Sequence, residues 1–174
     1  MAVRAAGDAR LRHDADALRL RSRVGARRLH EVELPPCAAI TAIGECVNYN
    51  GPPSLEPLFR RAWMALEPGG LLLFDAAAPG REPDGRRRAR HGGDGWVMRV
   101  DVAEDRAART LTRRIALVRD GRSSEALHVL RLYAREEVVD WLEASGFDVL
   151  CHPSYGAASR LPGMWVYLAT RRQR

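Results

Sequence analysis

The feature that most constrains this fold is a strand–helix–strand pattern in the first half of the chain. The run Cys37–Ile43 consists of small and β-branched residues without polar alternation, which is typical of a strand covered on both faces. A helix capped by Ser54 is indicated by apolar residues at helical spacing, namely Leu55, Leu58, Phe59, Ala62, Trp63 and Leu66. Pro68–Gly70 predicts a tight turn, and Leu71–Phe74 predicts a second buried strand. This order predicts a βαβ unit with two parallel strands.

A different pattern follows the second strand. Residues 79–95 are polar and rich in glycine and arginine, and we expect a mobile loop there. Three segments then predict an antiparallel meander: Trp96–Ala103, Arg109–Arg119 and Glu125–Tyr133. The Asp120–Gly121 pair is a hairpin signal between the last two of them.

The C-terminal part predicts one more helix and two more strands. Arg135–Ser145 is expected to be helical, with acidic residues in its first turn and Gly146 as its stop. Phe147–Cys151 and Met164–Thr170 predict an antiparallel pair at the edge of the sheet. The predicted fold class is therefore α/β, with a mostly parallel sheet, an antiparallel C-terminal strand pair and an inserted antiparallel meander.

Composition divides the 174 residues into a basic arm and one folded domain. Residues 1–28 carry eight arginines and three aspartates, and most of the net charge of +6 therefore lies there. This segment has few large apolar residues, so we expect a disordered arm or a weak helix, followed by a domain over residues 29–174. The domain is almost neutral, and the chain is not expected to bind nucleic acid.

Cysteine spacing and hydropathy exclude other classes. The three cysteines have no CxxC spacing, so the sequence predicts neither a disulfide framework nor a metal site. No apolar run approaches the ~20 residues that span a bilayer, and we expect a cytoplasmic protein without membrane contact.

The order of these landmarks carries a family resemblance. The strand ending in Gly44–Glu45, the Leu66–Gly70 turn (Leu-Glu-Pro-Gly-Gly), the strand ending in Phe74–Asp75 and the Ser145–Phe147 turn occur in the order and spacing usual for one family. Over residues 32–170 the chain resembles the carboxyl half of class I S-adenosylmethionine-dependent methyltransferases. The resemblance implies a Rossmann-like fold, S-adenosylmethionine as cofactor and a small-molecule methyl acceptor.

The resemblance also implies a site. Leu34–Asn50 looks like the family's fourth core strand and its loop, and ligands of such sheets lie beyond the carboxyl ends of the strands. It implies that the cofactor is bordered by Ile43, Gly44 and Glu45, and that the acceptor is faced by Asn48, Tyr49, Asp75 and Arg131. The candidate catalytic residues are Glu45, Tyr49 and His128, with Glu45 or His128 as a base.

Each of these residues also has a structural interpretation. Gly44 is equally typical of a turn, Asn48 of a side chain that caps backbone groups, and Tyr49 of a packing residue. His128 and Arg131 lie three apart on a predicted strand and are expected to face opposite sides.

The family's glycine-rich loop and its acidic strand ends have no counterpart before Leu34. We therefore expect a methyltransferase that lacks its N-terminal half and binds S-adenosylmethionine weakly or not at all. Two alternatives remain: a module that binds RNA or another polyanion through the arm and the run Arg86–Arg90, and a non-catalytic chain that self-associates or pairs with another chain through an exposed sheet edge.

Overall fold

The structure is a computed structural model that describes residues 29, 32–49, 51–156 and 161–173. The chain divides into a unit that ends at Glu33 and a compact unit, Leu34–Arg174, and only the second is described below. The predicted arm at residues 1–28 lies outside the described residues.

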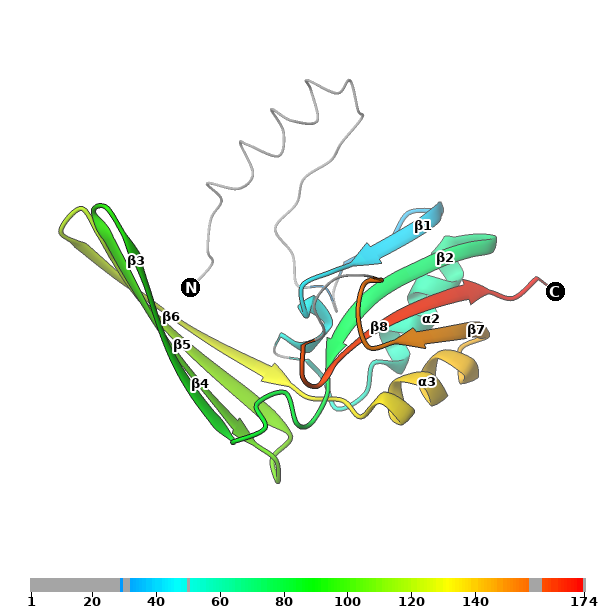
Figure 1. Ribbon diagram of the computed structural model, residues 1–174. Helices are drawn as coiled ribbons and strands as arrows, with labels where there is room; N and C mark the ends of the chain where they lie inside the picture. Colours follow the sequence, from blue (N-terminus) through cyan, green and yellow to red (C-terminus); the bar gives the residue numbers. More distant parts are fainter. Residues whose placement is uncertain (1–28, 30–31, 50, 157–160, 174) are drawn as a thin grey trace, which may run out of the picture. The chain divides into compact units, whose positions relative to one another are not determined.

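The first sheet, called sheet A, confirms the predicted βαβ unit. Its strand order is β1-β2-β8-β7, with β1 at Cys37–Ala42, β2 at Leu66–Ala77, β8 at Met164–Arg171 and β7 at Phe147–His152. β1 and β2 are neighbours and parallel, as Figure 1 shows. The C-terminal ends of both strands therefore meet at one edge of the sheet, where the following loop lies.

Two details of sheet A differ from the sequence prediction. The sheet is not mostly parallel, because β8 inserts between β2 and β7 and runs antiparallel to both. Pro68–Gly70 does not form a separate turn but lies within β2, at an irregularity where the pairing shifts from Cys37–Leu66 to Ala39–Leu71. The chain absorbs its Pro-Gly-Gly segment as a bulge because the strand begins directly after the helix.

The two α-helices of the described residues, α2 and α3, cover one face of sheet A (Figure 1). Helix α2, Glu56–Ala65, buries Leu58 and Phe59 among other apolar residues. The ring of Phe59 packs on Phe74 of β2, which stacks on Tyr167 of β8 with a centroid distance of 4.8 Å. These aromatic contacts form the centre of the core, where each ring removes a large apolar area from water.

The ends of the helices agree with the sequence to within one residue. Leu55, not Ser54, is the N-cap of α2, although the Ser54 hydroxyl accepts a hydrogen bond from the Glu56 N–H at 3.1 Å. Helix α3 spans Arg135–Ala144. Gly146 follows its C-cap Ser145, and the φ of Gly146, +96°, lies in the left-handed region. A short 3₁₀ helix, η2 at Cys46–Asn48, follows β1.

The second sheet, called sheet B, is an antiparallel meander of four strands rather than three. It runs in the order β3 (Arg86–Gly93), β4 (Trp96–Asp105), β5 (Thr110–Arg119) and β6 (Arg122–Arg131). β3 occupies about half of the segment that the sequence predicted as a mobile loop. The sequence pattern did not predict this strand because its residues are mostly exposed and show no apolar alternation. The strand is defined instead by its backbone pairing with β4.

Sheets A and B meet in a small apolar cluster at the end of β2. Its buried members are Ala77, Val102, Leu111, Leu130 and Leu132, and Tyr49 packs against it. The strands of sheet B are in register, so Val102, Leu111 and Leu130 share one face of that sheet. This face is the one that sheet B turns toward the loop after β1.

Replacing Leu111 by alanine is expected to lower the free energy of unfolding by about 2–5 kcal/mol, because the side chain is fully buried in this cluster. Leu127→Ala is the matched control: Leu127 lies on β6 of the same sheet, is 58% exposed, and its truncation should cost under about 1 kcal/mol. Urea unfolding of both variants measures the difference. Equal losses would contradict the assignment of this cluster as the junction of the sheets.

Candidate functional site

The loop after β1 begins with a tight turn that is held by a carboxylate of β2. Gly44 has a φ of +88° and Glu45 one of +57°, so both are left-handed. Asp75 Oδ2 accepts the Gly44 N–H at 3.0 Å, and Oδ1 accepts the Glu45 N–H. Because β1 and β2 are parallel neighbours, the end of β2 lies beside the turn and its carboxylate reaches both amides.

Asp75 has a third hydrogen-bond donor from the far end of the chain. The hydroxyl of Tyr155, in the connection between β7 and β8, donates to Asp75 Oδ2 at 2.7 Å. Burial and the hydrogen bond to Asp75 raise the pKa of Tyr155 above its ordinary value. Asp75 is 2% exposed, so its charge is compensated by these donors instead of water.

The side chain of Glu45 is buried between two arginines. Its Oε1 lies 2.8 Å from Arg81 Nε, and its Oε2 lies 3.1 Å from Arg113 Nη2. Each carboxylate oxygen therefore faces one guanidinium group. Glu45 is 5% exposed, so these ion pairs are shielded from solvent.

Tyr49 and His128 join this group through Arg113. Arg113 Nη1 donates to the Tyr49 hydroxyl at 3.3 Å, and the rings of Tyr49 and His128 meet edge to face with centroids 5.4 Å apart. Arg113 and His128 are register partners on β5 and β6 and so share a face of sheet B. The three residues predicted as catalytic, Glu45, Tyr49 and His128, thus come together with two arginines. We call these five residues the Glu45 cluster.

Asn48 is placed as a clamp between the two sheets. Its Nδ2 donates to the carbonyl oxygens of Ala77 at 2.9 Å and of Arg131 at 2.6 Å, and its Oδ1 accepts the Ala77 N–H at 2.9 Å. The side chain has no exposed surface. Its arrangement is that of a residue that caps backbone groups. The predicted contact of Asn48 with the methyl acceptor is not favoured by this arrangement, because the side-chain amide is already bonded to backbone groups.

Arg131, Ile43 and Asp75 lie around the cluster rather than in it. Arg131 is an odd number of residues from His128 along β6, so its side chain is on the opposite face of sheet B. Ile43 is 56% exposed at the end of β1. Asp75 contacts the turn and Tyr155 as described above, and a role in binding an acceptor stays a prediction.

Sequence reasoning missed three members of this arrangement: Arg81, Arg113 and Tyr155. Arg113 had a usable signal, because it follows Leu111 by two residues and a charged side chain on the inner face of a strand needs a partner. Arg81 and Tyr155 lie in connections, where no periodicity places a side chain.

Cys46, next to Glu45, does not add a reactive thiol to the cluster. Burial, and next the charge of Asp75, raise the pKa of the Cys46 thiol, which keeps it protonated at neutral pH. Among the described residues no group of three metal-binding side chains gathers, and no helix is long and apolar enough to cross a membrane.

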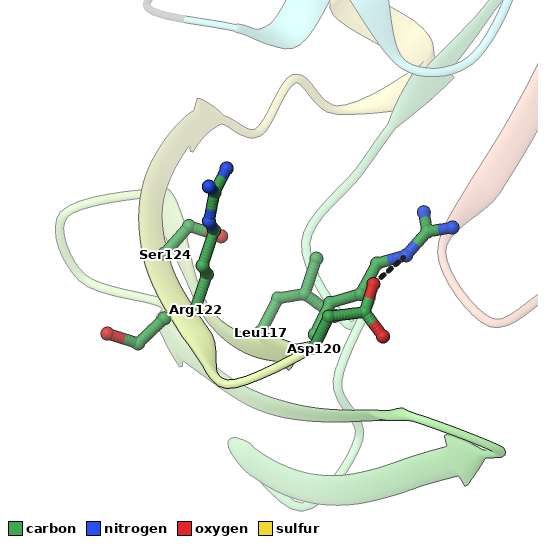
Figure 2. Close-up of a pocket in the computed structure, with 6 residues that line it drawn as sticks. Leu117, Asp120, Arg122 and Ser124 are labelled. Carbon is green, nitrogen blue, oxygen red and sulfur yellow. Dashed lines mark ion pairs between the residues drawn. The ribbon is translucent and has the colours of Figure 1, made fainter.

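A hollow at the β5–β6 turn lies away from the cluster. It is lined by Leu117, Arg119, Asp120, Arg122, Ser123 and Ser124, four of which are labelled in Figure 2. The ion pair drawn there, between Arg119 and Asp120, spans 3.6 Å, and both side chains are largely exposed. The hollow lies at the C-terminal end of β5, whereas Leu111 lies at its N-terminal end, and none of its lining residues belongs to the Glu45 cluster.

Comparison with known proteins identifies the fold. No family model and no curated protein sequence matches the chain. Among solved structures, an S-adenosylmethionine-dependent methyltransferase from Clostridium acetobutylicum ATCC 824 superposes with a TM-score of 0.79 at 16% identity, over 95% of this chain and 71% of that one.

Two further structures agree with the first. The CcbJ methyltransferase from Streptomyces caelestis has a TM-score of 0.70 at 18% identity, over 95% of this chain and 70% of its own. The sugar N-methyltransferase KedS8 from Streptoalloteichus sp ATCC 53650 has a TM-score of 0.68 at 17% identity, over 94% and 68%. The chain has the fold of class I S-adenosylmethionine-dependent methyltransferases, as the sequence landmarks predicted.

Arg113→Ala is expected to lower the free energy of unfolding by about 2 kcal/mol, because it leaves the buried Glu45 carboxylate with one partner instead of two. The control is Arg114→Ala, which removes the same charge from an exposed position on the other face of β5 and should cost less than about 0.5 kcal/mol. Chemical unfolding at low and high salt compares the two. If both variants lose the same unfolding free energy, the ion pair between Arg113 and Glu45 does not stabilise the fold.

Proposed function

We propose that this chain is an S-adenosylmethionine-dependent methyltransferase that acts on a small molecule. The observation that carries the proposal is the Gly44–Glu45 turn at the carboxyl ends of two parallel strands, with the Glu45 cluster directly beside it, in a fold shared with such enzymes. Ligands of open α/β sheets bind at this edge. The sugar N-methyltransferase among the structural neighbours supports a small-molecule acceptor.

The turn fits a cofactor in part. A Cβ added to Gly44 would meet no atom within 4 Å, so open space lies beside this residue, and the neighbouring Ile43 exposes an apolar side chain. Ile43 and the backbone of Gly44 would therefore hold the methyl donor. Glu45 does not fit this role through its side chain, since both carboxylate oxygens face arginines.

The bound cofactor would supply a methyl group already activated on a sulfonium, so the protein chiefly has to align the acceptor and remove its proton. Of the two candidate bases, His128 fits better than Glu45. A proton on Glu45 would disrupt two buried ion pairs. The half-buried imidazole of His128, by contrast, makes one ring contact among the described residues, a T-shaped contact with Tyr49. His128 would accept the proton, and Tyr49, oriented by Arg113, would position the acceptor.

Among the described residues we assign only Ile43 and the backbone of Gly44 to the cofactor, and so small a contact predicts low affinity. The chain spans about 70% of the length of its structural neighbours. We therefore expect S-adenosylmethionine to bind the 174-residue chain more weakly than micromolar, as the sequence landmarks also suggest.

The test is an NMR titration of the ¹⁵N-labelled chain with S-adenosylhomocysteine up to millimolar concentration. Shifts are expected at the amides of Ile43, Gly44 and Glu45. Gly44→Ala should abolish them because it fills the open space, while Gly121→Ala, which imposes a similar strain at a φ of +73° in the β5–β6 turn, should leave them unchanged.

Three results would contradict this function: no shift at the turn, equal effects of the two glycine variants, or a binding site elsewhere. Micromolar affinity by calorimetry would contradict the expected weakness of binding while supporting the function itself.

The sheet edge favours a second candidate, in which the chain self-associates. The outer edge of β1 pairs with no described strand, and β1 contains neither proline nor charge to block such pairing. Size-exclusion chromatography with light scattering is expected to show a dimer on this hypothesis, and a monomer at all concentrations would refute it.

The structure offers less support for a polyanion-binding module. Two arginines of the basic run on β3 are engaged by carboxylates: Arg87 lies 3.0 Å from Glu82 and Arg88 lies 2.8 Å from Asp101. Their charges are therefore already compensated.

A further inference from the structure

The connection between β7 and β8 reaches the candidate site at two points. Near its start, Tyr155 donates to Asp75. Near its end, the Pro162 carbonyl accepts a hydrogen bond from Arg81 Nη1 at 3.4 Å, and the Gly163 carbonyl accepts the Ala78 N–H at 2.7 Å. Both contacts connect the β7–β8 connection to Glu45. Tyr155 is connected to the Glu45 backbone amide through Asp75, and Pro162 to the Glu45 carboxylate through Arg81.

The turn needs such support because Glu45 is a non-glycine residue in the left-handed region, a strained conformation that persists only where its surroundings fix it. The fixing group is Asp75, whose two oxygens accept the amides of Gly44 and Glu45. The orientation of this carboxylate is in turn limited by the Tyr155 hydroxyl on Oδ2.

We propose that Tyr155 is a positioning residue: through Asp75 it holds the Gly44–Glu45 turn in the conformation that presents Ile43 and Gly44 to the methyl donor. This inference rests on the proposed function for the identity of the ligand, but its geometric part concerns only Tyr155, Asp75 and the turn. Tyr155 is 39% exposed, and its hydrogen bond to Asp75 is the contact that connects it to the turn.

Tyr155→Phe removes this hydrogen bond and keeps the ring. We expect the amides of Gly44 and Glu45 to exchange hydrogen roughly tenfold faster or more, the loss typical of a hydrogen bond to a charged group. Exchange of β2 and β8 amides and the melting temperature should stay near their original values. Ser154→Ala is the matched control, because its hydroxyl donates locally to the Gly156 carbonyl and does not touch Asp75.

A second measurement separates positioning from general stability. The dissociation constant of S-adenosylhomocysteine, measured by NMR titration, should rise severalfold in Tyr155→Phe and remain unchanged in Ser154→Ala. In an Asp75→Asn background, the Tyr155 substitution should add little, because both changes act on one hydrogen-bonded unit.

The proposal is overturned if exchange at Gly44 and Glu45 is unchanged, or if it rises equally throughout sheet A. If the local exchange increases but the ligand shifts no amide in any variant, the proposed function fails while the positioning role stands. If the ligand binds equally well to wild type and Tyr155→Phe, the function stands and the positioning role is overturned.

Discussion

The buried carboxylate of Asp75 is the interaction on which the arrangement of the site depends. A carboxylate removed from water is stable only with donors directed at it, and here three donors come from two segments that lie far from Asp75 in the sequence. Two are the amides of Gly44 and Glu45, and the third is the hydroxyl of Tyr155. The charge of one side chain therefore fixes the end of β1, the end of β2 and the β7–β8 connection relative to each other.

A neutral network performs the corresponding task for sheet B. The Asn48 amide bridges the backbone of Ala77 in sheet A and of Arg131 in sheet B, and the apolar cluster around Leu111 closes the space beside it. This junction fixes the position of sheet B. Because Arg113 and His128 are paired on neighbouring strands of that sheet, both side chains lie beside Glu45 and Tyr49. The placement of these side chains thus follows from strand pairing, which would suit the proposed function, in which two reactants have to be aligned.

The same contacts change how the polar residues are interpreted. Sequence reasoning left open whether Glu45 or His128 is the base, because both side chains are titratable and their positions in the sequence do not select one of them. The two arginines give Glu45 the surroundings of a counter-ion, while His128 keeps a half-buried ring next to Tyr49. Asn48 similarly has the surroundings of a structural clamp.

By itself, the sequence determined the elements whose signals are local. The parallel pair β1–β2 follows from apolar runs with a helix between them, and the Asp120–Gly121 turn follows from residues that accept positive φ, at +50° and +73°. Tertiary structure alone decided what local patterns do not encode. β3 is defined by pairing with β4 and not by its own residues, and the partners of Glu45 lie 36 and 68 positions away. The physical reason is that burial creates the demand for a partner, and only the folded chain determines which distant side chain meets it.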